Sequence, residues 1–370
     1  MRQLIICTKD FIDNYDRIIS HGNILLNEDL TYYALIEKDD IAFDPEVHKH
    51  AVLVKKYAFS CNYREMGIIK LVNTKIKNRN DLSYYVIGSE FSGVVMAVGT
   101  NVTTLKIGDR VLCDGSYPFA KDEGAQPGLP TNHASSELEV IHEAKLAVMP
   151  ANMDFATGAA FTIGAQTVYS MIEKLAVKQH DSILITGIKS NTSLFAINAL
   201  KNLQVEIFGL SRSPVDENYF RNMGVKQIFY NSDETPESLI TDKEILQHMI
   251  QNGKFDCVID PFGDHYLLKV LDLIAINGKY ITCGMSNQTV PKTTPVDLSN
   301  QIGKIVLGNI SIIGNCLGST QKLNDALMSY AQNELDVVID SVIKSDAQAF
   351  MNKSFLSKEK LGKVIFSYEP

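Results

Sequence analysis

The sequence predicts an α/β protein of two domains, one rich in β-strands and one built on a doubly wound parallel sheet. Its 370 residues exceed what a single hydrophobic core usually holds, and 45% of them are hydrophobic. The first half carries short apolar runs broken by turns, whereas the second alternates apolar runs with helical stretches. We therefore expect the β-rich domain to comprise residues 1–155 and 320–370, and the parallel-sheet domain residues 156–319.

The composition narrows the possible partners. The net charge is −8 and the lysines are scattered, so neither nucleic acid nor an anionic membrane surface is an expected partner. No apolar run reaches the roughly 18 residues that span a bilayer, and the first residues lack a signal-peptide core, so we expect a cytoplasmic protein. The six cysteines form no Cys-x-x-Cys pair, which predicts free thiols.

Short alternating runs predict the strands of the β-rich domain, at residues 51–54, 94–98, 110–112 and 138–141. The segment 321–370 combines a predicted helix at 323–334 with a final strand near 362–368. We expect this segment to return to the first domain and complete its sheet.

The parallel sheet is predicted from strands and helices in alternation. A helix at 192–202 follows the first of its expected strands, which lie at 182–186, 205–209, 257–260 and 280–284.

The turn after the first of these strands predicts a dinucleotide site. The strand ends at Gly187 and a helix follows, so backbone N–H groups and the helix dipole favour an anion there. Only one of the usual three glycines is present. The hydroxyls that replace the others could donate to a pyrophosphate, although Ser193 could instead be a plain helix cap. The predicted cofactor-binding residues are Gly187, Ser190, Asn191, Thr192 and Ser193, with Cys283 and Gly284 at the end of the strand 280–284.

The end of the next strand predicts that the cofactor is NADPH. An NAD site places an acidic residue about twenty residues beyond the glycine turn, but this chain has Ser211 and Arg212 there. An arginine beside hydroxyls suits the 2′-phosphate of NADPH, and the alternative is a solvated loop arginine.

Two glycine-containing segments carry a family resemblance. Residues 88–99, with Gly88, Gly93 and Gly99, and residues 105–111, with Gly108, resemble the medium-chain dehydrogenase/reductases. Further segments agree in order, so that the resemblance runs from about residue 51 to 318 and leaves 1–50 poorly matched. It implies a GroES-like catalytic domain, a Rossmann domain and an active-site cleft between them, and we expect a homodimer.

The resemblance also bears on the catalytic zinc of that family, which a cysteine, a histidine next to a glutamate and a second cysteine hold. Cys61 and Glu90 match two of these positions, but Ser89 replaces the histidine and no cysteine or histidine lies between Glu143 and Gln179. Because serine is a poor zinc ligand, we expect no metal. An atypical site of Cys61, Glu90 and His133 is the alternative.

The stretch Cys61, Asn62, Tyr63, Arg64 resembles one found in the zinc-free quinone oxidoreductases and enoyl reductases of the family, on the loop that faces the nicotinamide. Tyr63 would donate a proton or hold an enolate oxygen, and Asn62 would orient the carbonyl or the nicotinamide amide. The alternatives are that Tyr63 is a core aromatic and that Asn62 caps the next helix.

The predicted substrate pocket comprises Cys61, Glu90, Thr131, Asn132 and His133. The last three lie on the long loop 117–137, which is rich in proline and glycine, and hydrogen bonding within that loop is their alternative role.

These observations predict an NADPH-dependent reductase of an activated double bond in a small molecule or a peptide. The same stretches resemble, more distantly, reductases that convert dehydroalanine to D-alanine in lanthipeptides. An alcohol or polyol dehydrogenase with an atypical metal site, and a non-catalytic NADPH-binding protein, are the alternatives.

Overall fold

The computed structural model describes residues 1–26, 28–78, 83–122, 124–231, 239, 242–285 and 298–369. The chain forms two compact units. The first comprises Met1–Ile163, Ser319–Ala331 and Val337–Pro370, and the second comprises Gly164–Gly318 and Gln332–Asp336.

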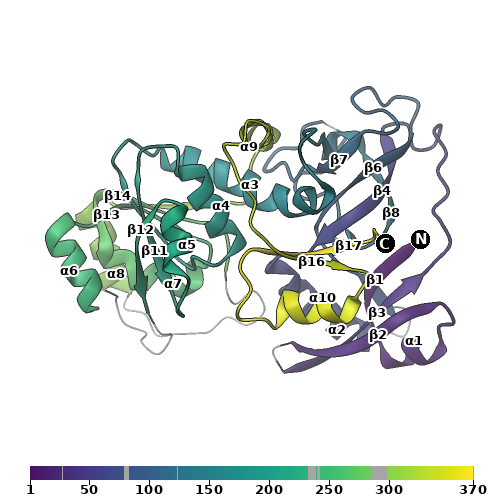
Figure 1. Ribbon diagram of the computed structural model, residues 1–370, viewed down its shortest axis with the longest axis horizontal. Coiled ribbons are helices and arrows are strands. Elements are labelled where there is room, and N and C mark those ends of the chain that lie inside the picture. Colours follow the sequence, from purple (N-terminus) through teal and green to yellow (C-terminus); the bar gives the residue numbers. More distant parts are fainter. Residues whose placement is uncertain are drawn as a thin grey trace. The chain divides into compact units, whose positions relative to one another are not determined.

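The central sheet of the first unit has seven strands in the order β16-β17-β4-β6-β7-β9, with β8 paired to β4 (Figure 1). These strands are β4 (Ala51–Ser60), β6 (Glu90–Val98), β7 (Arg110–Cys113), β8 (Leu138–His142), β9 (Leu146–Val148), β16 (Ile339–Lys344) and β17 (Lys363–Ser367). The four predicted strands are confirmed, and β4 is longer than predicted. Its apolar pattern breaks at two lysines, but Lys56 is fully buried and forms an ion pair with Glu139, so the strand continues.

The C-terminal segment returns to this sheet, as predicted. Strand β17 pairs antiparallel with β4, and Ile365 lies opposite Ser60. On the other side of β4, Glu90 of β6 also lies opposite Ser60. The neighbouring helix α9 (Thr320–Ala331) begins three residues before the predicted 323–334. Strand β4 therefore ends between the first residues of β6 and β17.

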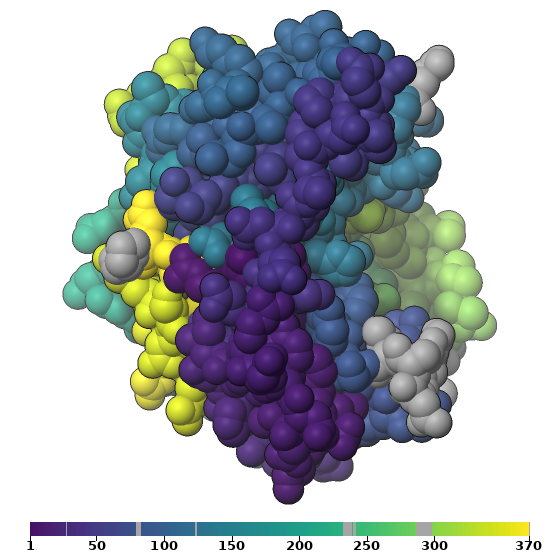
Figure 2. Space-filling view, turned by 90° about the vertical axis from the view of Figure 1, so that its right-hand side faces the viewer, coloured from purple at the N-terminus to yellow at the C-terminus, as the bar shows by residue number. Residues whose placement is uncertain are grey.

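Residues 1–50, which the family resemblance covers poorly, supply three of the four strands of a second sheet in the first unit. Its order is β2-β3-β1-β5, from β1 (Arg2–Cys7), β2 (Ile18–Leu26), β3 (Asp29–Glu37) and β5 (Tyr84–Val86). Leu4 and Ile6 of β1 join the main core of the unit, whereas Ile5 and Cys7 pack in a separate apolar cluster. The N-terminal and C-terminal segments lie side by side (Figure 2), and Arg2 donates to the carbonyl of Tyr368 over 2.8 Å.

Helices complete the first unit. They are α1 (Lys9–Asn14), α2 (Arg64–Asn78), α9, α10 (Ala347–Phe355) and the beginning of α3 (Phe155–Leu175). The rings of Phe59, Phe350 and Phe366 meet at centroid distances of 5.1–5.4 Å, which ties α10 to strands β4 and β17.

The second unit contains a six-stranded parallel sheet in the order β12-β11-β10-β13-β14-β15, with helices around it (Figure 1). The strands are β10 (Ser182–Ile185), β11 (Glu206–Ser211), β12 (Val225–Tyr230), β13 (Phe255–Asp260), β14 (Ile274–Thr282) and β15 (Ser311–Gly314). The helices are α4 (Asn191–Leu200), α5 (Glu217–Asn222), α6 (Lys243–Asn252), α7 (Gly263–Val270) and α8 (Leu298–Gly308), beside the end of α3. The order of the strands reverses between β10 and β13, so the carboxyl ends of these two strands are where such a sheet binds ligands.

This topology confirms the predicted doubly wound sheet. Within the described ranges, no helix combines the length and the apolar character that crossing a membrane requires.

Candidate functional site

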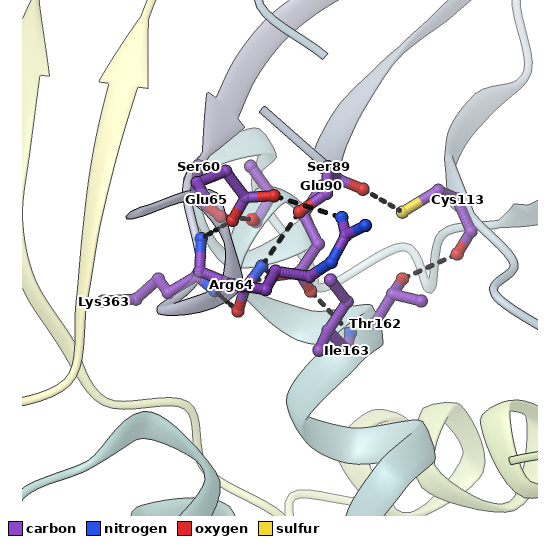
Figure 3. A network of polar contacts seen from close by, with 11 residues as sticks. Ser60, Arg64, Glu65, Ser89, Glu90, Cys113, Thr162, Ile163 and Lys363 are labelled. Carbon is purple, nitrogen blue, oxygen red and sulfur yellow. Dashed lines mark hydrogen bonds and ion pairs between the residues drawn. The ribbon is translucent and has the colours of Figure 1, made fainter. Parts of the chain in front are cut away.

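A buried network of polar side chains lies where β4 ends, and Glu90 is its centre (Figure 3). Its Oε1 accepts a 2.6 Å hydrogen bond from the backbone N–H of Ile163. Its Oε2 accepts from the ammonium of Lys363 over 2.6 Å and from the amide of Asn62 over 2.8 Å. Both oxygens are thus occupied, and the side chains of Glu90 and Lys363 are 0% and 4% exposed.

The amide of Asn62 is engaged on both of its ends. Its Nδ2 donates to Glu90 and, over 3.3 Å, to the hydroxyl of Ser89, while its Oδ1 accepts from Lys363. In this structure the amide of Asn62 is thus engaged with Glu90, Ser89 and Lys363, and a role toward the carbonyl or the nicotinamide amide stays a prediction.

Tyr63 differs from its buried neighbours because 49% of its surface is exposed. The alternative that it is a core aromatic is therefore wrong. It precedes α2 directly, and its carbonyl accepts from the N–H of Met66. The exposed side chain is accessible to a substrate and to solvent.

Arg64 connects the turn at Asn62 and Tyr63 to the loop that carries Asn132. Arg64 donates to Glu65 over 3.2 Å and to Asn132 over 3.0 Å, and Glu65 in turn accepts from the backbone N–H of Asn62. Burial raises the pKa of Glu65, although the charge of Arg64 opposes this shift. Asn132 is therefore linked through Arg64 to the turn that carries Asn62 and Tyr63, and its place in a substrate pocket stays a prediction.

The other two loop residues have structural contacts. The hydroxyl of Thr131 donates to Glu139 over 2.7 Å and accepts from the N–H of His133, and Glu139 also pairs with the buried Lys56. The ring of His133 lies edge-on against Tyr85, at 5.2 Å between centroids. The structure thus favours internal hydrogen bonding for Thr131, the alternative considered from the sequence.

The donor set around Cys61 does not fit a zinc ion. Burial raises the pKa of its thiol well above the ordinary value, and the charge of Glu65 adds to that rise. Glu90 has no oxygen without a hydrogen bond, and Ser89 offers only a hydroxyl. Among the residues that the structure describes, no group of three histidine, cysteine or acidic side chains could hold a metal.

In the second unit, the turn after β10 leads from Gly187 into helix α4. Gly187 has φ +52°, and a Cβ there would lie 2.7 Å from the ring of Phe262, so a larger residue would be strained. The helix cap is Ser190, whose hydroxyl accepts from the N–H of Ser193 over 3.1 Å. Ser193 is buried and donates to the carbonyl of Thr186, which corrects both sequence-based roles for Ser193, the phosphate ligand and the cap. Asn191 and Thr192 form the first turn of α4, and the buried Oδ1 of Asn191 has no hydrogen-bond partner among the described residues.

Two cations, Arg212 and Lys189, belong to the segments that follow β11 and β10. Arg212 is exposed directly after β11. Lys189, from the glycine turn, donates to the hydroxyl of Ser213, the residue after Arg212, over 2.9 Å. Ser211 is buried and its hydroxyl donates to the carbonyl of Ser213, which removes it from the predicted phosphate ligands.

Asp260 at the end of β13 is fully buried, and the sequence analysis gave it no role. It accepts from the hydroxyls of Thr186 and Tyr280 and from the N–H of Phe262. These bonds link the carboxyl ends of β10, β13 and β14 beside Gly187. Directly after β14, burial raises the pKa of Cys283 to about 12, and the carbonyl of Gly284 accepts from the N–H of Gly263.

Sequence reasoning missed Lys363, Lys189 and Asp260. Lys363 stands alone at the start of the last strand, 273 residues from Glu90, so no local pattern could connect the two. Asp260 ends a strand of the parallel sheet, and its position at that carboxyl end was the one signal available.

Comparisons with known proteins agree with both units. A model described as alcohol dehydrogenase GroES-like domain matches residues 48–150, and one described as zinc-binding dehydrogenase matches residues 192–333. Quinone oxidoreductase of Homo sapiens is 28% identical over 270 residues, 72% of this chain and 74% of that protein.

Solved structures share the fold. An NAD-dependent alcohol dehydrogenase gives a TM-score of 0.73 at 22% identity, covering 95% of this chain and 99% of that one. A 2-octenoyl-CoA carboxylase reductase, in complex with NADP and 2-octenoyl-CoA, gives 0.73 at 17% identity over 99% and 87%. With a GroES-like first unit, a Rossmann-like second unit and a family model matching part of each, the chain has the fold of the medium-chain dehydrogenase/reductases.

Proposed function

We propose that this protein is an NADPH-dependent, zinc-independent reductase of activated carbon–carbon double bonds. The observation that carries the proposal is the saturation of Glu90 by Lys363, Asn62 and Ile163 beside the exposed Tyr63. A site whose glutamate is fully hydrogen-bonded and which carries a half-exposed tyrosine suits the reduction of an α,β-unsaturated carbonyl, which needs hydrogen-bond and proton donors in place of a Lewis acid.

The reaction divides between cofactor and protein. The reduced nicotinamide, when bound, supplies hydride to the β carbon of the substrate. Tyr63 holds the oxygen on which negative charge develops or gives a proton to the α carbon, and its exposure allows water to restore that proton. Cys61 and Asn132 remain proposed members of the pocket, while Asn62 and Glu90 are proposed to hold Tyr63 in place.

The cofactor is proposed to bind the second unit. Gly187, Ser190, Asn191 and Thr192 would surround the pyrophosphate, with Cys283 and Gly284 near the nicotinamide. Lys189 and Arg212 would pair with the 2′-phosphate, whose double charge suits two cations. The unpaired Oδ1 of Asn191 supports this assignment, because a ribose hydroxyl would satisfy it.

The relatives support a double-bond reductase without selecting its substrate. The names of the similar proteins include a quinone oxidoreductase and an enoyl-CoA carboxylase reductase. None of the proteins named above is a dehydroamino-acid reductase, so a dehydroalanine peptide is one substrate class among several.

A homodimer through β15 is the assembly we propose. This edge strand of the parallel sheet has no charged residue. The opposite edge strand β12 carries Lys226, and a charged residue on an edge strand hinders pairing with another chain. The adjacent α8 has no buried residue and exposes Leu298, Ile302, Val306 and Leu307. Two copies of β15 can pair antiparallel about a two-fold axis and cover these side chains.

The test is NADPH oxidation with a panel of enones, quinones, enoyl thioesters and dehydroalanine peptides, with primary alcohols and NADP⁺ as the comparison. We expect turnover with at least one unsaturated carbonyl and none with alcohols. Zinc-dependent alcohol oxidation would contradict the proposal, and tight NADPH binding without any turnover would support a non-catalytic role.

A further inference from the structure

The sheet register brings Lys363 to the turn that carries Tyr63. Strands β6 and β17 flank β4, and both Glu90 and Ile365 lie opposite Ser60. Because side chains alternate along a strand, Lys363 lies on the same face of the sheet as Ile365. Past Ser60 the chain leaves the sheet, and Lys363 and Glu90 meet across the space beyond the end of β4 (Figure 3).

The ammonium of Lys363 determines which way the Asn62 amide points. Oδ1 of Asn62 accepts from Lys363, and Nδ2 donates to Glu90 and Ser89. A flipped amide would set its N–H groups against the ammonium and its oxygen against the carboxylate of Glu90. Both contacts would be repulsive, so the charges of Lys363 and Glu90 leave one orientation.

The backbone of the turn is held as well. The N–H of Asn62 donates to Glu65, and Arg64 connects Glu65 to Asn132. Side chain and backbone of Asn62 are therefore both fixed, directly before Tyr63. The positive charge that fixes the side chain of Asn62 belongs to Lys363, 301 residues farther along the chain.

We propose that Lys363 is a positioning residue that holds Tyr63 for proton donation through the Asn62 amide. This inference rests on the proposed reductase function. Buried ion pairs add little net stability compared with apolar residues of similar volume, so the value of this pair lies in the single orientation that it enforces. A small displacement of a reacting group can lower the rate about 10²-fold, so loss of this orientation should reduce turnover measurably.

The first test is a double-mutant cycle on turnover in the full chain. Lys363→Met and Asn62→Ala should each lower kcat about 10- to 100-fold with NADPH affinity unchanged. The double variant should lose little more than either single variant, because both changes remove the same hold. Lys145→Met is the matched control, since Lys145 is also buried in the first unit but donates to Ser116. It should lower the melting temperature and leave kcat unchanged.

The second test does not depend on activity. Hydrogen–deuterium exchange of peptides covering residues 60–66, without cofactor or substrate, should be about tenfold faster in the charge-balanced variant Lys363→Met with Glu90→Gln than in the wild type. Peptides covering residues 191–200 should be unchanged. This variant also serves if Lys363→Met alone does not fold.

Unchanged kcat in folded Lys363→Met, losses that multiply in the cycle, or equal exchange at residues 60–66 would each overturn the inference. If the wild type reduces no substrate of the panel, the proposed function fails, and the exchange experiment still decides whether Lys363 holds the turn.

Discussion

The hydroxyl of Thr186 donates a 2.6 Å hydrogen bond to the carboxylate of Asp260, and none of the surface of Asp260 is exposed. This bond joins the carboxyl ends of β10 and β13, the two strands between which the order of the sheet reverses. The titratable carboxyl group of Asp260 is thus bonded to the residue that directly precedes Gly187.

This carboxylate predicts a pH dependence of stability. Burial raises the pKa of Asp260, while hydrogen bonds from Thr186 and Tyr280 oppose the rise. A carboxyl group that binds its proton more tightly in the folded chain stabilises it at low pH, and this contribution is lost as the pH rises through the folded pKa. The Tm of Asp260→Asn minus that of the wild type should therefore increase between about pH 4 and pH 7. Thermal unfolding of both proteins across this range measures it, and a constant or falling difference would contradict the assignment.

Tyr63→Phe should lower turnover by roughly 10²–10³ while leaving NADPH affinity unchanged, because it removes one preorganised donor. Stability should hardly change, since the ring is 49% exposed. Steady-state kinetics, cofactor titration and thermal unfolding of the same preparation measure the three effects. Full activity of the variant, on a substrate that the wild type reduces, would remove Tyr63 from the mechanism.

NADPH should bind at least tenfold tighter than NADH. A charge-assisted hydrogen bond to phosphate is worth about 1.5–3 kcal/mol, so Arg212→Ala and Lys189→Ala should each remove much of this preference. Titration of both cofactors against the three proteins separates loss of preference from general loss of binding. Equal wild-type affinity for NADH and NADPH would count against the 2′-phosphate site.

Activity should survive strong chelators, and the purified protein should hold far less than one zinc per chain. The reason is the donor set, because both oxygens of Glu90 already accept hydrogen bonds and serine, a poor zinc ligand, stands at position 89. Elemental analysis and activity after dialysis against a chelator provide the measurement. Stoichiometric zinc that leaves together with activity would favour the alcohol dehydrogenase alternative.

Ile312→Lys should convert the proposed dimer to a monomer, because it places a charge on the exposed edge strand β15. Light scattering after size exclusion measures the mass. Leu246→Lys, on an exposed position of α6 beside the opposite edge, is the control and should leave the mass unchanged. A monomeric wild type would remove the proposed assembly.

The sequence by itself predicted both domains because strands and helices have different apolar periods, and both periods can be read along the chain. It also identified Gly187, Tyr63 and Asn132, since turns and loops carry local signals. It included Asn62 among the site residues but could not give its hydrogen-bond partners. An amide can bind a substrate or neighbouring side chains, and the surrounding residues determine which of these it does.

Only the tertiary structure could decide which charges face one another. Lys363 meets Glu90 across 273 residues because β17 returns antiparallel to β4, and no local pattern encodes that pairing. Lys189 reaches Ser213 because the parallel strands β10 and β11 end at the same edge of the sheet. Burial is likewise a property of the assembled core, since a side chain is desolvated by residues distant in sequence. It raises the pKa of Cys61, and it leaves Lys56 paired with Glu139 inside the core.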